Sequence, residues 1–192
     1  MFVTSGAYKG AKLSLASGSP ARPTGSKVRM ALFNILHREV QNSSWLDLFA
    51  GSGIIGIEAL SRGASHVSFV DNNPKTAKQL QDNCQRIIGN KGGYQVIRSD
   101  VQRVSATQLG MATMSFIYAD PPYQDIIKWL PWFEKNIPLF LCPSGVFILE
   151  TAQKVHEEIG QILVKKDSLH LDKKKIYGHT ALTFLKKTDN KP

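Results

Sequence analysis

The sequence has few cysteines, no long hydrophobic run and no metal-ligand motif, and each absence excludes a class of protein. Its two cysteines, Cys84 and Cys142, lie far apart in the chain. They predict reduced thiols in a cytoplasmic protein, with neither a disulfide framework nor a metal site. No run reaches the roughly 18 apolar residues of a spanning helix, and no signal peptide is visible at residues 1–12. We therefore expect no membrane partner.

The chain carries a basic excess, and its two ends hold all of it. The 192 residues include 24 Lys and Arg against 15 Asp and Glu, a net charge of +9. Residues 1–40 hold six basic residues against one acidic, residues 151–192 nine against five, and residues 41–150 nine against nine. Basic ends on a neutral body favour a polyanionic partner, nucleic acid before membrane. A soluble protein with surplus surface lysine is the alternative interpretation.

From residue 45 the pattern alternates strand and helix. This predicts five βα units followed by a hairpin with a turn near Lys173, that is, an α/β fold with a doubly wound, mostly parallel seven-stranded sheet and an antiparallel edge strand. The expected strands are 45–49, 66–70, 94–98, 114–119, 145–150, 162–171 and 175–185, and the expected helices 53–62, 74–88, 101–109, 125–136 and 153–159.

The first 40 residues form a basic extension of the same structural unit, and residues 41–192 form the main domain. Residues 2–15 alternate small and bulky side chains around Gly6 and Gly10, which predicts a short hairpin. Ser26 is expected to cap a helix whose apolar stripe is Val28, Ala31, Leu32, Ile35 and Leu36.

The loop after the first strand contains a glycine pattern that two kinds of cofactor site share. Gly51, Gly53 and Gly56 spell G-x-G-x-x-G, and Asp71 lies 20 residues after Gly51. Read mechanically, this is the fingerprint of a dinucleotide-binding enzyme. The pattern alone does not decide, since Asp71 can accept from ribose hydroxyls in either site.

Charge separates the two alternatives. Asp47 stands four residues before Gly51, where it would repel a pyrophosphate by about 1–4 kcal/mol. The same carboxylate favours S-adenosylmethionine, which carries a sulfonium and an ammonium and no phosphate. Asp100, at the end of the third strand, is placed to accept from the adenine amino group. Taken singly, each Asp could instead be a helix cap or a turn former.

A stiff loop follows the fourth strand. Asp120, Pro121, Pro122 and Tyr123 place a carboxylate, a fixed carbonyl and an aromatic ring together. This set suits methylation of an exocyclic amino group on a nucleobase. Hydrogen bonds to the Asp120 carboxylate and the Pro121 carbonyl would localise the nitrogen lone pair, and Tyr123 would stack on the base.

Longer segments carry a resemblance to one family. They are the run from Arg22 through Arg29 to Leu36, residues 46–53 and 56–64, the 120–123 loop and residues 175–180. Together they resemble the RsmD-type bacterial 16S rRNA (guanine-N2) methyltransferases over nearly the whole chain. The resemblance implies a class I S-adenosylmethionine-dependent fold. It also implies a partner, 16S rRNA in a partly assembled 30S subunit, which we expect a monomer to bind.

The resemblance also implies roles for individual residues. Asp120, Pro121, Pro122 and Tyr123 would hold the target base. RNA contacts are expected at Lys9, Lys12, Arg22, Arg29 and Lys173, with the cofactor carboxylate as the alternative partner of Arg29. Cofactor contacts are expected at Asp47, Phe49, Gly51, Gly53, Asp71, Asn72, Asp100, Val101, Arg22 and Thr24.

The chain departs from the family at two places, and four other functions are alternatives. Met30 stands where the family usually has Glu, and the hairpin carries Lys9 and Lys12 but no Arg. The same chemistry could act on adenine N6 in DNA or on a protein glutamine. A nicotinamide oxidoreductase and a non-catalytic RNA-binding assembly factor are the more distant alternatives.

Overall fold

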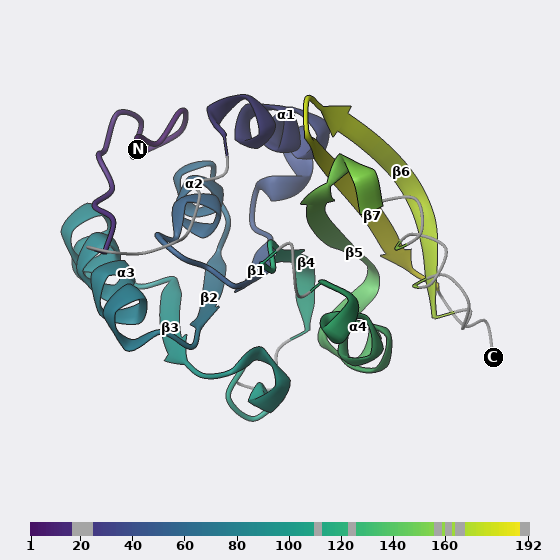
Figure 1. Ribbon diagram of the computed structural model, residues 1–192. Coiled ribbons are helices and arrows are strands. Elements are labelled where there is room, and N and C mark those ends of the chain that lie inside the picture. Colours follow the sequence, from purple (N-terminus) through teal and green to yellow (C-terminus); the bar gives the residue numbers. More distant parts are fainter. Residues whose placement is uncertain are drawn as a thin grey trace.

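The computed structural model describes residues 1–16, 25–109, 113–122, 126–155, 159, 163 and 168–188. Its centre is a seven-stranded sheet in the order β3-β2-β1-β4-β5-β7-β6 (Figure 1). This confirms the predicted fold class, with the antiparallel strand β7 one place in from the edge strand β6. The strands are β1 (Ser44–Leu48), β2 (His66–Asp71), β3 (Tyr94–Arg98), β4 (Met114–Ala119), β5 (Leu141–Ala152), β6 (Leu169–Tyr177) and β7 (Thr180–Lys187).

Helices cover both faces of the sheet. The helices α1 (Ser26–Leu36), α2 (Ile54–Ser61) and α3 (Pro74–Ile87) pack on one face, and α4 (Ile126–Phe140) packs on the other (Figure 1). Each face buries its own hydrophobic cluster, around Trp45 on the first and Phe133 on the second. Four 3₁₀ turns complete the described elements: η1 (His37–Val40), η2 (Gly89–Lys91), η3 (Val101–Arg103) and η4 (Gln153–Val155).

The predicted C-terminal hairpin is present, but its turn lies elsewhere. Lys173 lies inside β6, and the chain reverses at Gly178, whose φ of +61° an L side chain rarely adopts. Pairing with β7 on both sides of an irregularity at Asp172 therefore extends β6 through the three lysines.

One predicted helix is short, and one predicted cap is wrong. Only η3 forms within 101–109, with the Asp100 side chain capping it. At 153–159 the described structure begins with η4, and residues 156–158 lie outside the described residues. Ser26 is the first residue of α1 rather than its cap, and Gly25 precedes the helix without a side-chain hydrogen bond.

The N-terminal residues form a short antiparallel pairing that joins the core. Val3 N donates to Ala11 O at 3.0 Å, and Leu13 N donates to Met1 O at 2.9 Å. Val3 and Leu13 are buried in the same cluster as Trp45. The segment lies beside α2 and α3 (Figure 1).

The sheet order places the candidate site. The chain runs from β1 outward to β3 and then returns to β4 on the other side of β1. Ligands of doubly wound sheets bind at such a switch point, beyond the carboxyl ends of the strands. The described part of the chain contains no helix long and apolar enough to cross a membrane.

Candidate active site

The loop between β1 and α2 holds three residues in left-handed backbone conformations, Phe49, Gly51 and Gly53. A Cβ added to Gly53 would lie 2.2 Å from Leu80 Cδ1, whereas one added to Gly51 would meet nothing closer than 3.9 Å. Gly53 is therefore required by packing, and Gly51 by its φ of +55° alone. The open side of Gly51 lets a ligand approach the backbone closely. The Phe49 ring packs edge-on against Trp129 of α4.

The amide groups of the three pattern glycines already have partners inside the protein. Gly51 N donates to Asp71 Oδ2 at 3.0 Å, and Gly56 N donates to Asp47 Oδ2 at 3.1 Å. The second glycine of the pattern, Gly53, donates to Ala50 O at 2.8 Å. A pyrophosphate binds at such loops through free N–H groups. Here carboxylates occupy two of the three, so the loop is built differently from a phosphate cradle.

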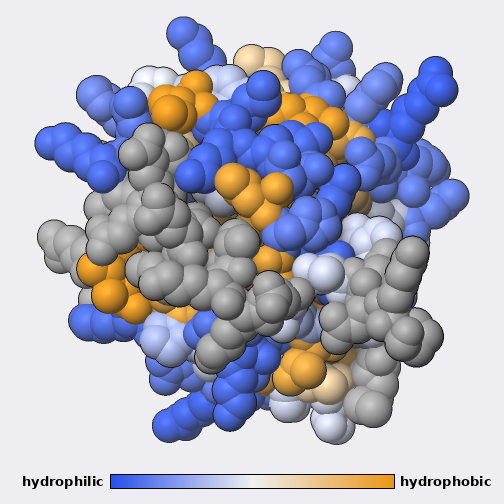
Figure 2. Space-filling view, turned by 90° about the vertical axis from the view of Figure 1, so that its right-hand side faces the viewer, coloured by the Kyte–Doolittle hydropathy of each residue, from blue (hydrophilic) through white to orange (hydrophobic). Residues whose placement is uncertain are grey.

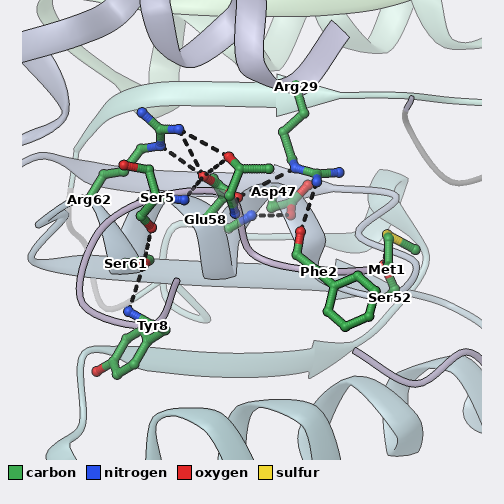
Figure 3. A network of polar contacts seen from close by, with 12 residues as sticks. Met1, Phe2, Ser5, Tyr8, Arg29, Asp47, Ser52, Glu58, Ser61 and Arg62 are labelled. Atoms are coloured by element: carbon green, nitrogen blue, oxygen red, sulfur yellow. Dashed lines mark hydrogen bonds and ion pairs between the residues drawn. The ribbon is translucent and has the colours of Figure 1, made fainter. Parts of the chain in front are cut away.

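Asp47 lies near the end of β1, and its buried carboxyl lies beside the N-terminus of α2. It is 2% exposed, and burial raises its pKa to about 8. The hydrogen bond that Asp47 accepts from Gly56, dashed in Figure 3, opposes this shift. The charge of Asp71 adds to it. A buried carboxyl that has no nearby cation gains free energy when a cationic ligand arrives.

The predicted acidic residues at the ends of β2 and β3 both accept hydrogen bonds from loop amides, Asp71 from Gly51 and Asn73 and Asp100 from Gln102. Asp71 Oδ1 accepts from Asn73 N, and burial raises the pKa of Asp71. Asp100 Oδ1 accepts from Gln102 N at 2.9 Å and caps η3. These are the turn and cap roles that the sequence left open. Both carboxylates keep further lone pairs for a ligand. Of the other predicted contacts, Asn72 is exposed and Val101 is buried.

The loop after β4 brings Asp120 to the same edge of the sheet. The pKa of Asp120 is raised to about 8, mainly by burial and further by the charges of Glu150 and Asp47. Pro121 is buried and Pro122 is exposed. The structure thus brings Asp47 and Asp120 together, as the sequence predicts. Three further predicted site residues, Arg22, Thr24 and Tyr123, lie outside the described residues.

Glu150 belongs to the same group of carboxyls as Asp47 and Asp120, and it was not among the residues predicted from the sequence. It is 3% exposed on β5 and accepts a hydrogen bond from the Tyr118 hydroxyl. The available signal was a lone acidic residue at the end of the apolar run Val146–Leu149. Among the described residues, no Lys or Arg forms an ion pair with Asp47, Asp120 or Glu150, and no three acidic, His or Cys side chains are arranged to hold a metal ion.

A second buried carboxylate, Glu58 of α2, is fully paired (Figure 3). Its oxygens accept from Thr4 N at 2.8 Å, from Ser5 N at 3.1 Å and from Arg62 Nε at 2.9 Å. Arg29 Nε lies 3.5 Å from Glu58 Oε2. Sequence analysis missed this network, although Glu58 and Arg62 stand at i,i+4 spacing.

The prediction that Arg29 contacts RNA is wrong. Arg29 is 2% exposed, its Nη2 donates to Phe2 O at 2.9 Å, and it pairs with Glu58. Burial lowers the pKa of its guanidinium, which Glu58 opposes. The residue therefore fastens the N-terminal segment to the core instead of reaching a substrate.

Asn83 of α3 joins the N-terminal segment to the glycine loop. It is fully buried, accepts from Ser14 N at 3.0 Å and donates to Ser14 O at 2.9 Å. The same amide nitrogen donates to Ser52 O at 3.2 Å, between Gly51 and Gly53. One side chain thus supports the loop from behind, and no sequence pattern signalled this contact.

The remaining predicted RNA contacts lie on two separate surfaces. Lys9 and Lys12 are exposed on the N-terminal segment, beside α2 and α3. Lys173 lies on the edge strand β6, where its Nζ is 3.2 Å from Asp172 Oδ2. The face that includes β6 is mostly hydrophilic, with separate hydrophobic spots (Figure 2). The two groups therefore lie at opposite ends of the sheet (Figure 1).

Known proteins resemble this chain along most of its length. The model of the family described as conserved hypothetical protein 95 matches residues 1–186. A Bacillus subtilis protein named "Putative rRNA methyltransferase YlbH" is 33% identical over 191 residues, which cover 97% of this chain and 99% of the relative.

Two further proteins are similar to this chain. Ribosomal RNA small subunit methyltransferase D of Haemophilus influenzae is 33% identical over 121 residues, 63% of each chain. The solved structure titled "Putative methyltransferase yhhF from Escherichia coli" superposes with a TM-score of 0.77 at 23% identity and covers 97% of both chains. At that identity, the superposition establishes the fold.

Proposed function

Because the chain belongs to the conserved hypothetical protein 95 family, the RsmD family, we propose that it transfers a methyl group from S-adenosylmethionine to the exocyclic N2 of a guanine in 16S rRNA. The names of its relatives support rRNA methylation. The observation that carries the choice of cofactor is the glycine loop, whose Gly51 and Gly56 amides donate to carboxylates.

The strand-end residues fit this cofactor. S-adenosylmethionine, when bound, supplies an electrophilic methyl group on a cationic sulfur. Asp47 and the loop at Gly51 would hold its charged methionine end, Asp71 the ribose hydroxyls, and Asp100 the adenine amino group. A site lined with carboxylates suits this cation and opposes a pyrophosphate. Phe49, Asn72, Val101, Arg22 and Thr24 complete the proposed cofactor contacts.

The loop after β4 would hold the target base. Asp120 and the Pro121 carbonyl accept hydrogen bonds from the amino group, which localises its lone pair. That lone pair would form the new N–C bond, the electrons of the broken S–C bond would remain with the donor, and the nitrogen would release one proton. Pro121 and Pro122 keep the acceptors in place, and Tyr123 stacks on the extruded base.

We propose as substrate a partly assembled 30S subunit, bound by a monomer of this protein in the cytoplasm. Lys9 and Lys12 are exposed, as phosphate contacts must be, and Lys173 and Arg22 complete the set. A small-subunit particle can present one guanine to the cleft while its phosphates meet basic residues on both sides.

Methyl transfer to purified 30S particles tests this function. We expect radioactive methyl groups from S-adenosylmethionine to enter one guanine of 16S rRNA in particles from a strain that lacks the protein, and not in wild-type particles. Transfer to adenine in DNA or to a protein glutamine instead would change the substrate. Binding of NAD without S-adenosylhomocysteine would refute methyl transfer. If Asp120→Ala left methylation unchanged, the proposed role of the loop would be wrong.

A further inference from the structure

The register of β4 and β5 places Glu150 beside Asp120. Ala119 pairs with Leu149, so the next residues along these parallel strands, Asp120 and Glu150, are neighbours at the carboxyl end of the sheet. Side chains alternate between the two faces of a strand, and Tyr118 is paired with Ile148. Asp120 and Glu150 therefore continue the face that Tyr118 and Ile148 begin.

Glu150 is held firmly behind Asp120. Its backbone lies in the ladder with β7, opposite Leu182, and its side chain is 3% exposed. The Tyr118 hydroxyl donates to Glu150 Oε2 and so keeps the carboxyl directed along the sheet. Asp120 is more exposed and follows the end of β4, where the proposed site lies. A substrate would meet Asp120 and leave Glu150 out of reach.

The groups that face this pair come from several elements. Asp47 of β1 lies close enough to Asp120 to raise its pKa, and Glu150 contributes more strongly. Burial raises the pKa of Glu150, whereas the Tyr118 hydrogen bond lowers it. Arg29 of α1 faces Tyr118, but its partner is Glu58. Two adjacent buried carboxyls cannot both ionise readily, so they retain a proton near neutral pH.

We propose that Glu150, held by the Tyr118 hydroxyl, is a positioning residue that increases the proton affinity of Asp120. This rests on the proposed function, in which Asp120 accepts a hydrogen bond from the amino group. A carboxylate with a higher proton affinity binds the N–H group more strongly as positive charge develops on nitrogen. Asp120 then takes the proton that nitrogen releases, and passes it to water at the open side of the cleft.

The test follows the carboxyl groups directly, without turnover. Proteins labelled with ¹³C at Asp and Glu carboxyls are titrated by NMR without ligand, and Asp120→Asn identifies the Asp120 signal. In the wild type we expect Asp120 to titrate near its pKa of about 8. In Glu150→Gln the midpoint falls by about one pH unit or more. In Tyr118→Phe it falls less, because Glu150 then takes up the shared proton more readily.

The rate of methyl transfer gives the second readout. In Glu150→Gln the acid limb of the pH–rate profile moves to lower pH, and kcat at high pH falls about tenfold. The melting temperature stays level or rises, since the variant removes a buried charge, whereas loss of a purely structural contact would lower it.

Two results would overturn the proposal. One is an Asp120 midpoint that is the same in Glu150→Gln and the wild type. The other is a shifted midpoint with an unchanged kcat at high pH, which would make Glu150 irrelevant to the reaction. A wild-type protein that methylates no substrate would instead refute the proposed function, and the titration would still decide whether the two carboxyls interact.

Discussion

The buried carboxylate Glu58 of α2 and the carboxyl groups near the ends of β1, β4 and β5 have opposite surroundings. Glu58 is met by two arginines and by the backbone of Thr4 and Ser5. Asp47 and its neighbours at the strand ends receive hydrogen bonds but, within the described residues, no cation. Glu58 is therefore satisfied within the chain and serves the fold. We therefore expect a ligand to supply the positive charge that no described residue brings to the strand-end group.

Removing the charge of Glu58 should have the largest effect on stability. In Glu58→Gln, Arg29 and Arg62 remain without their carboxylate, and breaking such a buried pair costs about 3–5 kcal/mol. We expect a loss of that size in the free energy of unfolding, measured with urea at pH 7. Asp47→Asn is the matched variant, and it should not destabilise the protein. Equal losses in both variants would erase the distinction between the two groups.

In contrast to Glu58→Gln, Asp120→Asn should lower the activity and leave the stability intact. The amide cannot accept from both the substrate and its surroundings as a carboxylate does, and loss of one such group typically lowers kcat about 10²–10³-fold. Unfolding by urea should be unaffected or shifted to higher concentration. Asp172→Asn, which changes a carboxylate on β6 far from the cleft, serves as the control and should retain full activity.

The pH dependence of stability sharpens the comparison further. Asp47 has a pKa of about 8 when folded against 3.8 as its ordinary value. Between these values the folded protein binds the extra proton, so stability falls as pH rises from about 4 to 8, by up to about 1.4 kcal/mol per pH unit. Asp47→Asn should remove this contribution. Thermal unfolding of both proteins between pH 5 and 9 measures the difference, and parallel curves would contradict the assignment.

Asn83 contacts both the N-terminal segment and the glycine loop, so its replacement tests whether the segment supports the loop. Asn83→Ala removes the bonds to Ser14 and to the Ser52 carbonyl of the glycine loop. We expect binding of S-adenosylhomocysteine to weaken about tenfold, the effect of roughly 1.4 kcal/mol. Thr4→Val loosens the same segment at its Glu58 end, away from the loop. It should leave this affinity within twofold, as measured by calorimetry.

The smallest effect concerns the surface charges. Replacing Lys9, Lys12, Arg22 and Lys173 together by Ala should weaken binding to 16S rRNA and flatten its dependence on salt, since fewer counterions are released. Affinity for S-adenosylhomocysteine should change little. Lys173 already pairs with Asp172, so we expect it to contribute least of the four. An unaltered salt slope in filter-binding assays would show that these residues do not contact phosphate.

Much of the fold could be predicted because its signals are local. The apolar runs of β1 to β5 lie between turn signals and cofactor-loop glycines, and their order along the chain determines a doubly wound sheet. The turn at Gly178 was misplaced because pairing between β6 and β7, a tertiary effect, extends the strand through Lys173–Lys175.

The same distinction between local and distant signals applies to the residues of the site. Asp47, Asp71 and Asp120 could be predicted as candidates because each stands next to a loop motif, and their roles remain a proposal. Glu150 and Asn83 were missed, since their partners lie 32 and 69 residues away in the sequence. Arg29 was misassigned because its burial depends on Glu58, a contact that no spacing rule indicates.

The central claim is that the strand-end carboxylates are completed by a cationic methyl donor. Calorimetry with S-adenosylmethionine, S-adenosylhomocysteine and NAD, on the wild type and on Asp47→Asn, tests it most directly. The account predicts that both sulfur compounds bind the wild type, that Asp47→Asn weakens them at least about tenfold with its fold intact, and that NAD does not bind. Equal binding to the two proteins, or tight binding of NAD alone, would contradict it.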